Sequence, residues 1–272
     1  YQAARAYARE RVQGKRDGRP TAIVGHPDVR RMLLTMKSQI EAMRGLVLTA
    51  GAAVDTAQRH ADAEMRAAAQ RRVELLTPIV KAWCTDLGVE IASMGIQVHG
   101  GMGYIEDCRA PQHLRDARIT TIYEGTNGIQ ALDLAGRKLA MAGGELPFEL
   151  FRELRLELRG LEADGWHDLV PPLRDALAGA EAATRWLQAD HGGDADAVAA
   201  GATPYLRLMA QTLGGFLLAR AAHRAAAHGH PAATAKRTTA AFYVTRLLPP
   251  ASALLGAVTA GSRDLDTALF DD

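Results

Sequence analysis

The chain has 272 residues, of which 48% are hydrophobic and 5% aromatic, and its 32 basic and 31 acidic side chains give a net charge of +1. So balanced a charge argues against a phosphate-binding surface, and nucleic acid is not expected as a partner. Two cysteines are too few for a disulfide framework, no signal peptide is recognisable, and no uninterrupted apolar run reaches the roughly 20 residues that span a bilayer. These features predict a cytoplasmic protein without a membrane span.

Long runs of Ala, Leu, Arg and Glu favour packed helices over a sheet, and we expect an all-α fold. A first helix is predicted from Gln2 to Arg11. It is followed by a polar loop around Gly14, Gly18 and Pro20. The chain starts in mid-helix without an initiator Met, which is typical of a piece of a longer protein.

A long helix is predicted to open at His26-Pro27-Asp28. From Val29 onward, apolar residues recur in alternating steps of three and four, so that one stripe faces inward. The stripe consists of Met32, Met36, Ile40, Met43, Val47, Ala50, Val54 and Ala57. A shorter helical segment is expected over residues 63–76.

Thr77-Pro78 predicts the start of another helix, because Thr can cap it and Pro is tolerated in the first turn. This helix should end at Gly100-Gly101, where glycine accepts the left-handed geometry of a helix end. The two long helices are expected to pack antiparallel in a bundle. The apolar stripe of the second one is Val80, Trp83, Leu87, Ile91, Met94 and Val98.

Pro147 marks the predicted boundary between a helical bundle, residues 1–144, and a second helical domain, residues 147–272. The end of the bundle should contain an irregular loop at 102–104, a short helix at 111–118 and a helix at 126–141. Helices of the second domain are expected at 147–161, 171–189, 204–228 and 231–258. Its predicted core is Phe216, Leu217, Phe242, Leu247 and Leu248.

The most informative stretch is IYEGTNGIQ at 122–130. It sets the single carboxylate of Glu124 in a glycine-bracketed turn directly before an amphipathic helix, which is a suitable place for an enzymatic base. The alternative is that Glu124 is an acidic residue favoured near a helix N-terminus by the helix macrodipole.

Three segments in this order resemble the C-terminal helical domain of flavin-dependent acyl-CoA dehydrogenases. They are YARERVQG at 7–14, QVHGGMGY at 97–104, and LRDARI at 114–119 running on to YEGT at 123–126. The second half is similar to the extra helical domain of larger family members, including those similar to methylmercaptopropionyl-CoA dehydrogenase. That likeness rests on its position and on FYVTRLLP at 242–249.

The resemblance implies that Glu124 removes the α-proton of an acyl thioester while FAD accepts the β-hydride. A glutamate with a reference pKa of about 4.3 is too weak a base, so we expect the site to bury Glu124 and exclude water. Tyr123 and Ile122 would supply an apolar wall beside the substrate. Backbone N–H groups of the Glu124-Gly125 turn would polarise the thioester carbonyl.

The resemblance also implies contacts to FAD. Arg11 would pair with the pyrophosphate, for which a guanidinium is well shaped, unless it is a solvated helix arginine. Gln97, Gly100 and Gly101 would receive the adenosine-diphosphate half from a neighbouring subunit, unless they form a plain helix stop. Thr126 and Asn127 would contact the flavin, unless Thr126 is only an N-cap and Asn127 a polar first-turn residue.

The implied partners are an acyl-CoA substrate, an electron-transfer flavoprotein as acceptor, and further copies of the chain in a dimer or tetramer. A second hypothesis is an oligomerisation or partner module, or one half of a heteromeric dehydrogenase; a third is a degenerate homologue without activity. The sequence departs from the family at Val12-Gln13-Gly14, which lacks the usual aromatic residue, and at Pro27. No metal is expected, because His223, His228 and His230 lack acidic or thiolate partners at ligand spacing.

Overall fold

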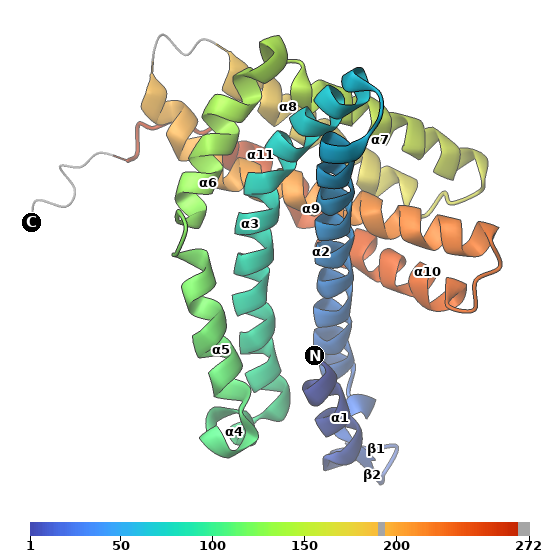
Figure 1. Cartoon of the computed structure of the whole chain (residues 1–272). Coiled ribbons are helices and arrows are strands. Elements are labelled where there is room, and N and C mark those ends of the chain that lie inside the picture. Colours follow the sequence, from blue (N-terminus) through green and yellow to red (C-terminus); the bar gives the residue numbers. More distant parts are fainter. Residues whose placement is uncertain (190–193, 266–272) are drawn as a thin grey trace, which may run out of the picture.

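The computed structural model describes residues 1–189 and 194–265, and helices dominate it (Figure 1). The all-α prediction is confirmed, with one small hairpin as an exception. The elements are α1 (Gln2–Glu10), β1 (Val12–Arg16), β2 (Arg19–Ala22), α2 (Pro27–Arg59), α3 (Ala63–His99), α4 (Gly101–Tyr104), α5 (Ala110–Arg118), α6 (Asn127–Asp133), α7 (Leu146–Ala163), α8 (Val170–Gln188), α9 (Ala195–Ala227), α10 (Ala233–Phe242) and α11 (Pro249–Val258).

Helices α2 and α3 form a long antiparallel pair, as predicted (Figure 1). Asp62 begins α3 as its N-cap, and its carboxylate accepts the Glu64 N–H at 2.8 Å. The α3 stripe is mostly buried, whereas in the α2 stripe only Met32 and Met36 are buried and most other members are half-buried. Val47 is 48% exposed, and Leu46 takes its place in the core. The stripe drifts because a straight helix turns once in about 3.6 residues, whereas steps of three and four average 3.5.

Two helix starts that we predicted at prolines are wrong. Helix α3 continues through Pro78, and α9 begins at Ala195 rather than at Pro204. A proline inside a helix removes one backbone hydrogen bond, but Pro78 lies buried beside Leu76 and Ile79. Tertiary packing of this apolar face outweighs the local preference of proline for a helix start.

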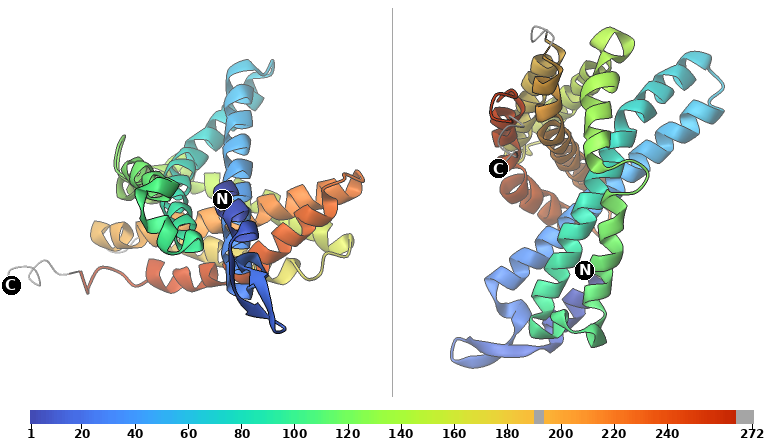
Figure 2. Two further views of the ribbon diagram at one scale, coloured as in Figure 1. Left: turned by 90° about the horizontal axis from the view of Figure 1, so that it is seen from below. Right: turned by 90° about the vertical axis from the view of Figure 1, so that its left-hand side faces the viewer.

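The loop predicted around Gly14 and Gly18 is instead an antiparallel hairpin of β1 and β2, which projects from the end of the bundle (Figure 2). Its turn has Asp17 at φ 51° and Gly18 at φ 76°. Two successive positive φ angles give a type I′ turn, for which Asp-Gly is a preferred sequence. Both strands lack the apolar alternation that would have predicted them.

The second half is built around α9, which packs against α8, α10 and α11 and also against α2 and α3. Gly214 of α9 lies at this crossing, where a Cβ atom would come within 2.8 Å of Trp83 Cη2 and of the Tyr243 hydroxyl. One hydrophobic core therefore runs through both halves. A domain boundary at Pro147 stays a prediction, with Pro147 in the first turn of α7.

The core of the second half contains two tyrosines that the sequence analysis missed, Tyr205 and Tyr243. The Tyr205 hydroxyl lies 2.7 Å from Thr184 Oγ1, and the Tyr243 hydroxyl donates to the Gln211 carbonyl at 3.2 Å. These partners allow the rings to be buried without leaving a polar group unpaired. Of the predicted core residues, Phe216 and Leu248 are buried, while Leu217, Phe242 and Leu247 are half-buried.

One segment of the described chain, residues 233–258, is long and apolar enough to cross a membrane by length and composition. It joins α10 to α11 through the π-helical turn Tyr243–Leu247. A core helix of a globular protein passes the same test, and Val244, Leu248 and Ala251 are fully buried in the hydrophobic core. Only 28% of the apolar window in this segment is buried, however, so most of it lies at the surface of the described chain.

Lys138 is buried by a second π-helical turn, Leu134–Lys138, which follows α6. Its side chain is 4% exposed and forms an ion pair with Glu74 of α3, with Asp133 Oδ2 at 3.9 Å from the same ammonium. The hydrogen bond from Lys138 lowers the pKa of Glu74 from its ordinary value of 4.5. The pair links α3 to the end of the bundle.

Replacing Lys138 with Met should reduce the loss of folding stability that occurs as the pH falls into the acidic range. A carboxylate with a lowered pKa stabilises the fold above its ordinary pKa, and this stabilisation is lost as the pH falls through the folded-state pKa. Wild type should therefore lose stability as the pH falls below 4.5, and Lys138→Met should lose less. Urea unfolding across this range measures the slope, with exposed Lys15→Met as control; an unchanged slope in Lys138→Met contradicts the assignment.

Candidate functional site

The turn around Glu124 joins α5 to α6. After α5, the N–H groups of Ile122 and Tyr123 both donate to the Ile119 carbonyl, at 2.9 and 3.1 Å. Glu124 then has φ 52° and Gly125 has φ 83°, so two successive left-handed residues redirect the chain. A left-handed backbone is uncommon for a residue with a side chain, and such residues cluster at functional sites.

Thr126 and Asn127 begin α6. Thr126 Oγ1 accepts the Ile129 N–H at 3.3 Å, so its N-cap role is present, and a hydroxyl that accepts one bond still has a proton to donate. Asn127 instead turns towards α3. Its amide nitrogen donates to the Ala82 carbonyl at 3.1 Å and to Asp86 Oδ1 at 2.6 Å. The Asn127 side chain therefore binds α3, and its expected flavin contact stays a prediction.

Glu124 is exposed, as are Tyr123 (50%) and Ile122 (45%). The predicted burial of Glu124 is therefore not found among the described residues. The reason is geometric, since the connection between α5 and α6 runs along the outer edge of the bundle with no further element over it (Figure 1). The other side of the expected site would have to come from outside this chain.

Exposed apolar side chains continue along the segment from α4 to α6. Exposed apolar side chains are typical of surfaces that a ligand or another chain covers. The segment from α4 to α6 is therefore suited to form one wall of a larger site. The residues concerned are Met102, Tyr104, Ile105, Ile119, Ile122, Tyr123, Ile129 and Leu132.

The predicted glycine segment ends α3. Gly100 has φ 60°, and its N–H donates to the Gln97 carbonyl at 3.1 Å. A Cβ atom on Gly101 would meet nothing within 4 Å, so neither space nor a positive φ demands glycine there. The sequence analysis missed Gly103, which is buried and where a Cβ would lie 2.3 Å from the Ile96 carbonyl oxygen.

Arg11 follows α1 at the same end of the bundle as α4 (Figure 1). Its side chain is exposed, and the Tyr7 ring packs on the His99 ring with 4.7 Å between centroids, which fixes α1 against the end of α3. The predicted residues thus form two groups, one near Gly100 and one around Glu124. Asn127 bonds to Ala82 of α3, and Gly100 caps the far end of the same helix, so the two groups lie roughly 27 Å apart at about 1.5 Å per residue.

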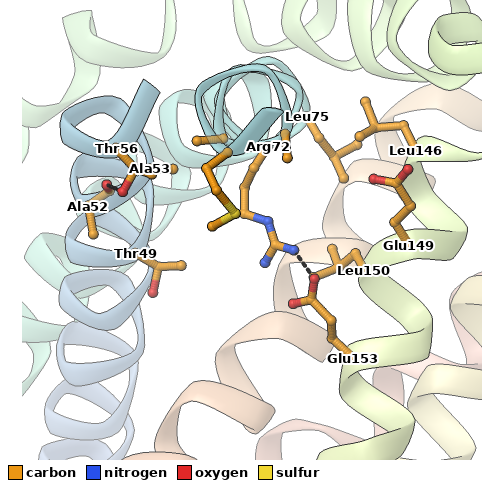
Figure 3. A pocket seen from close by; sticks show the side chains of 13 residues that line it. Thr49, Ala52, Ala53, Thr56, Arg72, Leu75, Leu146, Glu149, Leu150 and Glu153 are labelled. Carbon is orange, nitrogen blue, oxygen red and sulfur yellow. Dashed lines mark hydrogen bonds and ion pairs between the residues drawn. The ribbon is translucent and has the colours of Figure 1, made fainter. Parts of the chain in front are cut away.

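The cavities in the described part of the chain lie away from the Glu124 side chain, and two of them bear on the predicted site or its helices. One of about 370 Å³ lies between α2, α3 and α7, where Arg72 forms an ion pair with Glu153 (Figure 3). Another, of about 400 Å³, lies between α3, α6 and α9 and is lined by Trp83, Asn127 and Arg207, among others. Only the second touches the predicted site, through the first turn of α6.

The remaining candidates have structural partners. His223 Nε2 lies 2.7 Å from Asp164 Oδ2, and its ring packs edge-on against Trp166. Burial raises the pKa of the Cys84 thiol to about 11, so it stays protonated at neutral pH. Within residues 1–189 and 194–265, no three His, Cys, Asp or Glu side chains are grouped so as to hold a metal ion.

Residues 1–139 match the family model described as "Acyl-CoA dehydrogenase, C-terminal domain". The chain belongs to the acyl-CoA dehydrogenase family. Residues 150–267 match a second model, "Acetyl-CoA dehydrogenase C-terminal like", and α7 begins between the two matched ranges.

Known acyl-CoA dehydrogenases resemble the chain in sequence and in fold. It is 39% identical to 3-methylmercaptopropionyl-CoA dehydrogenase of Ruegeria pomeroyi over 98% of its own length, and covers 47% of that protein. An acyl-CoA dehydrogenase of Bacillus anthracis complexed with FAD matches 95% of the chain with a TM-score of 0.71 and 20% identity, the match covering 44% of that structure. Caenorhabditis elegans ACDH-11 in complex with C11-CoA matches 90% with a TM-score of 0.69 and 21% identity, covering 40% of that structure.

These matches confirm the resemblance and the helical fold. The chain spans about half the length of the relative from Ruegeria pomeroyi. The structural matches, at such low identity, speak for the acyl-CoA dehydrogenase fold alone. The roles of individual residues stay predictions.

Proposed function

We propose that the chain is the C-terminal portion of an FAD-dependent acyl-CoA dehydrogenase, in which Glu124 is the base that removes the α-proton of the acyl thioester. The observation that carries the proposal is the left-handed Glu124-Gly125 turn at the head of a capped helix, in a chain of this family. FAD, when bound, would accept the β-hydride. The products would be an enoyl-CoA and reduced flavin.

The residues of the chain fit FAD in part. Gly101 keeps its backbone open although the fold does not need glycine there, and Arg11 supplies a cation at the same end of the bundle, as an anionic pyrophosphate requires. Exposed Ile122 and Tyr123 suit an apolar acyl or ring surface. The Asn127 side chain is bonded to α3, so it gives no support of its own for a contact with FAD.

The proposed reaction requires several groups of this chain to act together. Glu124 would take the α-proton onto a carboxylate oxygen, and its wall of Tyr123 and Ile122 would exclude water once the site is covered. The N–H groups of Glu124 and Gly125 would donate to the thioester oxygen as negative charge develops there. The expected partners are an electron-transfer flavoprotein and further copies of the chain in the cytoplasm.

A pair of glycine variants separates cofactor binding from folding. Gly101→Ala should fold normally and bind less FAD, because its Cβ meets open space in the protein and would obstruct only a ligand. Gly103→Ala should lower stability by about 1–3 kcal/mol, because its Cβ would collide with backbone. Thermal unfolding and flavin content of the full-length protein measure both; normal flavin content in Gly101→Ala contradicts the proposed FAD contact.

The test of the proposed function is flavin bleaching by acyl-CoA. Full-length protein reconstituted with FAD should lose its oxidised-flavin absorbance when acyl-CoA thioesters are added without oxygen. A panel of short, long and heteroatom-bearing acyl groups is needed, because the pocket floor cannot be derived from this chain. If FAD binds but no thioester of the panel reduces it, the proposed dehydrogenase activity is refuted.

A second function has its own support. Val47 is 48% and Leu48 73% exposed on α2, which suits an oligomerisation or partner module or one half of a heteromeric dehydrogenase. Mixing the chain with a candidate N-terminal half distinguishes the cases. Flavin absorbance recovered on mixing supports a split dehydrogenase, whereas stable assembly without flavin supports the module.

A further inference from the structure

We propose that Lys81 is a positioning residue that holds the Glu124-Gly125 turn in place against α3. This inference rests on the proposed function, because it concerns the residue that we assign as the base. Lys81 lies on α3, more than forty positions before the turn in sequence, and its side chain reaches across to α6.

The Lys81 ammonium bonds to two residues that follow Glu124, one in the turn and one in α6. Its Nζ donates to the Gly125 carbonyl at 2.7 Å and to Asn127 Oδ1 at 2.8 Å. Hydrogen bonds from a charged donor are stronger than those between neutral groups. Lys81 therefore fixes the Gly125–Thr126 peptide and the first residue of α6 with one side chain.

The backbone of Glu124 needs such support. Its φ of 52° is disfavoured for a residue with a Cβ atom and persists only where the surroundings enforce it. The side chain of Glu124 is exposed, so side-chain packing contributes little to holding the turn. The bond from Lys81 to Gly125 is a direct link between this turn and the long, well-packed helix α3.

Lys81 is linked through the Asn127 amide to Asp86 rather than to Glu124. Asn127 accepts from Lys81 and donates to Asp86 Oδ1 at 2.6 Å, and Thr85 joins the same network. Among the described residues, no ion pair joins Lys81 to Glu124. Lys81 thus holds the backbone of the turn without engaging the Glu124 carboxylate.

The test compares three variants of the full-length protein. Lys81→Met keeps the length of the side chain and removes the donor, and Lys81→Arg restores a charged donor. Lys37→Met is the matched control, since half-buried Lys37 ties α2 to α10 through Thr239 at 2.7 Å, far from the turn in sequence and packing. Hydrogen–deuterium exchange over residues 119–131 reports on the turn itself, whether or not flavin is bound.

Exchange over 119–131 should be several-fold faster in Lys81→Met than in wild type, partly restored in Lys81→Arg and unchanged in Lys37→Met. The single-turnover rate of flavin bleaching per bound flavin should fall by about 10–100-fold in Lys81→Met, with little change in acyl-CoA affinity. Unchanged exchange overturns the inference regardless of activity. Faster exchange with an unchanged bleaching rate per flavin also overturns it, whereas a wild type that no acyl-CoA bleaches refutes the proposed function instead.

Discussion

Replacing Glu124 with Gln in the full-length protein is expected to slow flavin bleaching by acyl-CoA by about 10²–10⁴-fold, the range that a general base contributes. Gln keeps the size and the hydrogen-bonding capacity of the side chain but cannot take up the α-proton. The backbone N–H groups of the turn remain, so substrate binding should change little. Anaerobic single-turnover bleaching gives the rate, and substrate titration gives the affinity.

Glu162→Gln is the matched control for this variant. Glu162 lies on α7 and pairs with Arg174 at 3.2 Å at the surface, away from the Glu124 turn. Its substitution should leave the bleaching rate and flavin content unchanged. Rapid bleaching in Glu124→Gln with normal flavin content would assign the base to another residue, even if the family's chemistry is present.

Replacing Trp83 with Ala is expected to lower the free energy of unfolding by about 3–5 kcal/mol. Trp83 of α3 is 3% exposed, and its ring approaches Gly214 of α9 where the two halves of the chain meet. Removing the indole leaves a cavity in a junction that cannot collapse, because α2, α3 and α9 are held by long interfaces. Urea unfolding followed by circular dichroism measures the change.

An apolar residue on the surface provides the comparison. Leu156 of α7 is 64% exposed, and Leu156→Ala should change the free energy of unfolding by no more than about 0.5 kcal/mol. Two separate unfolding transitions in wild type would show that the halves unfold independently. A loss below about 1 kcal/mol in Trp83→Ala would contradict a continuous core.

Local sequence signals predicted most of the helices because those signals act within a few residues. Thr126 caps α6, Gly100 ends α3, and Pro27 opens α2, each for a reason that is readable from its neighbours. The same signals failed at Pro78 and Pro204. There the burial of an apolar face, which depends on distant helices, decides the outcome.

The candidate site was only partly predictable for the same reason. The glycine-bracketed turn could be identified from sequence, but Asn127 faces α3 rather than outward, and no spacing rule gives that orientation. Lys81 was missed because its link to Gly125 spans 44 residues. The shielding that we predicted for Glu124 is not found, since no described element of this chain covers the turn.

A structure of the full-length protein with FAD and a non-reacting acyl-CoA analogue tests the central claim most directly. It should show a Glu124 carboxylate oxygen within about 3.5 Å of the substrate's α-carbon, enclosed away from water between the flavin and the apolar wall. A Glu124 carboxylate that still faces bulk solvent, with another base at the α-carbon, would contradict the account.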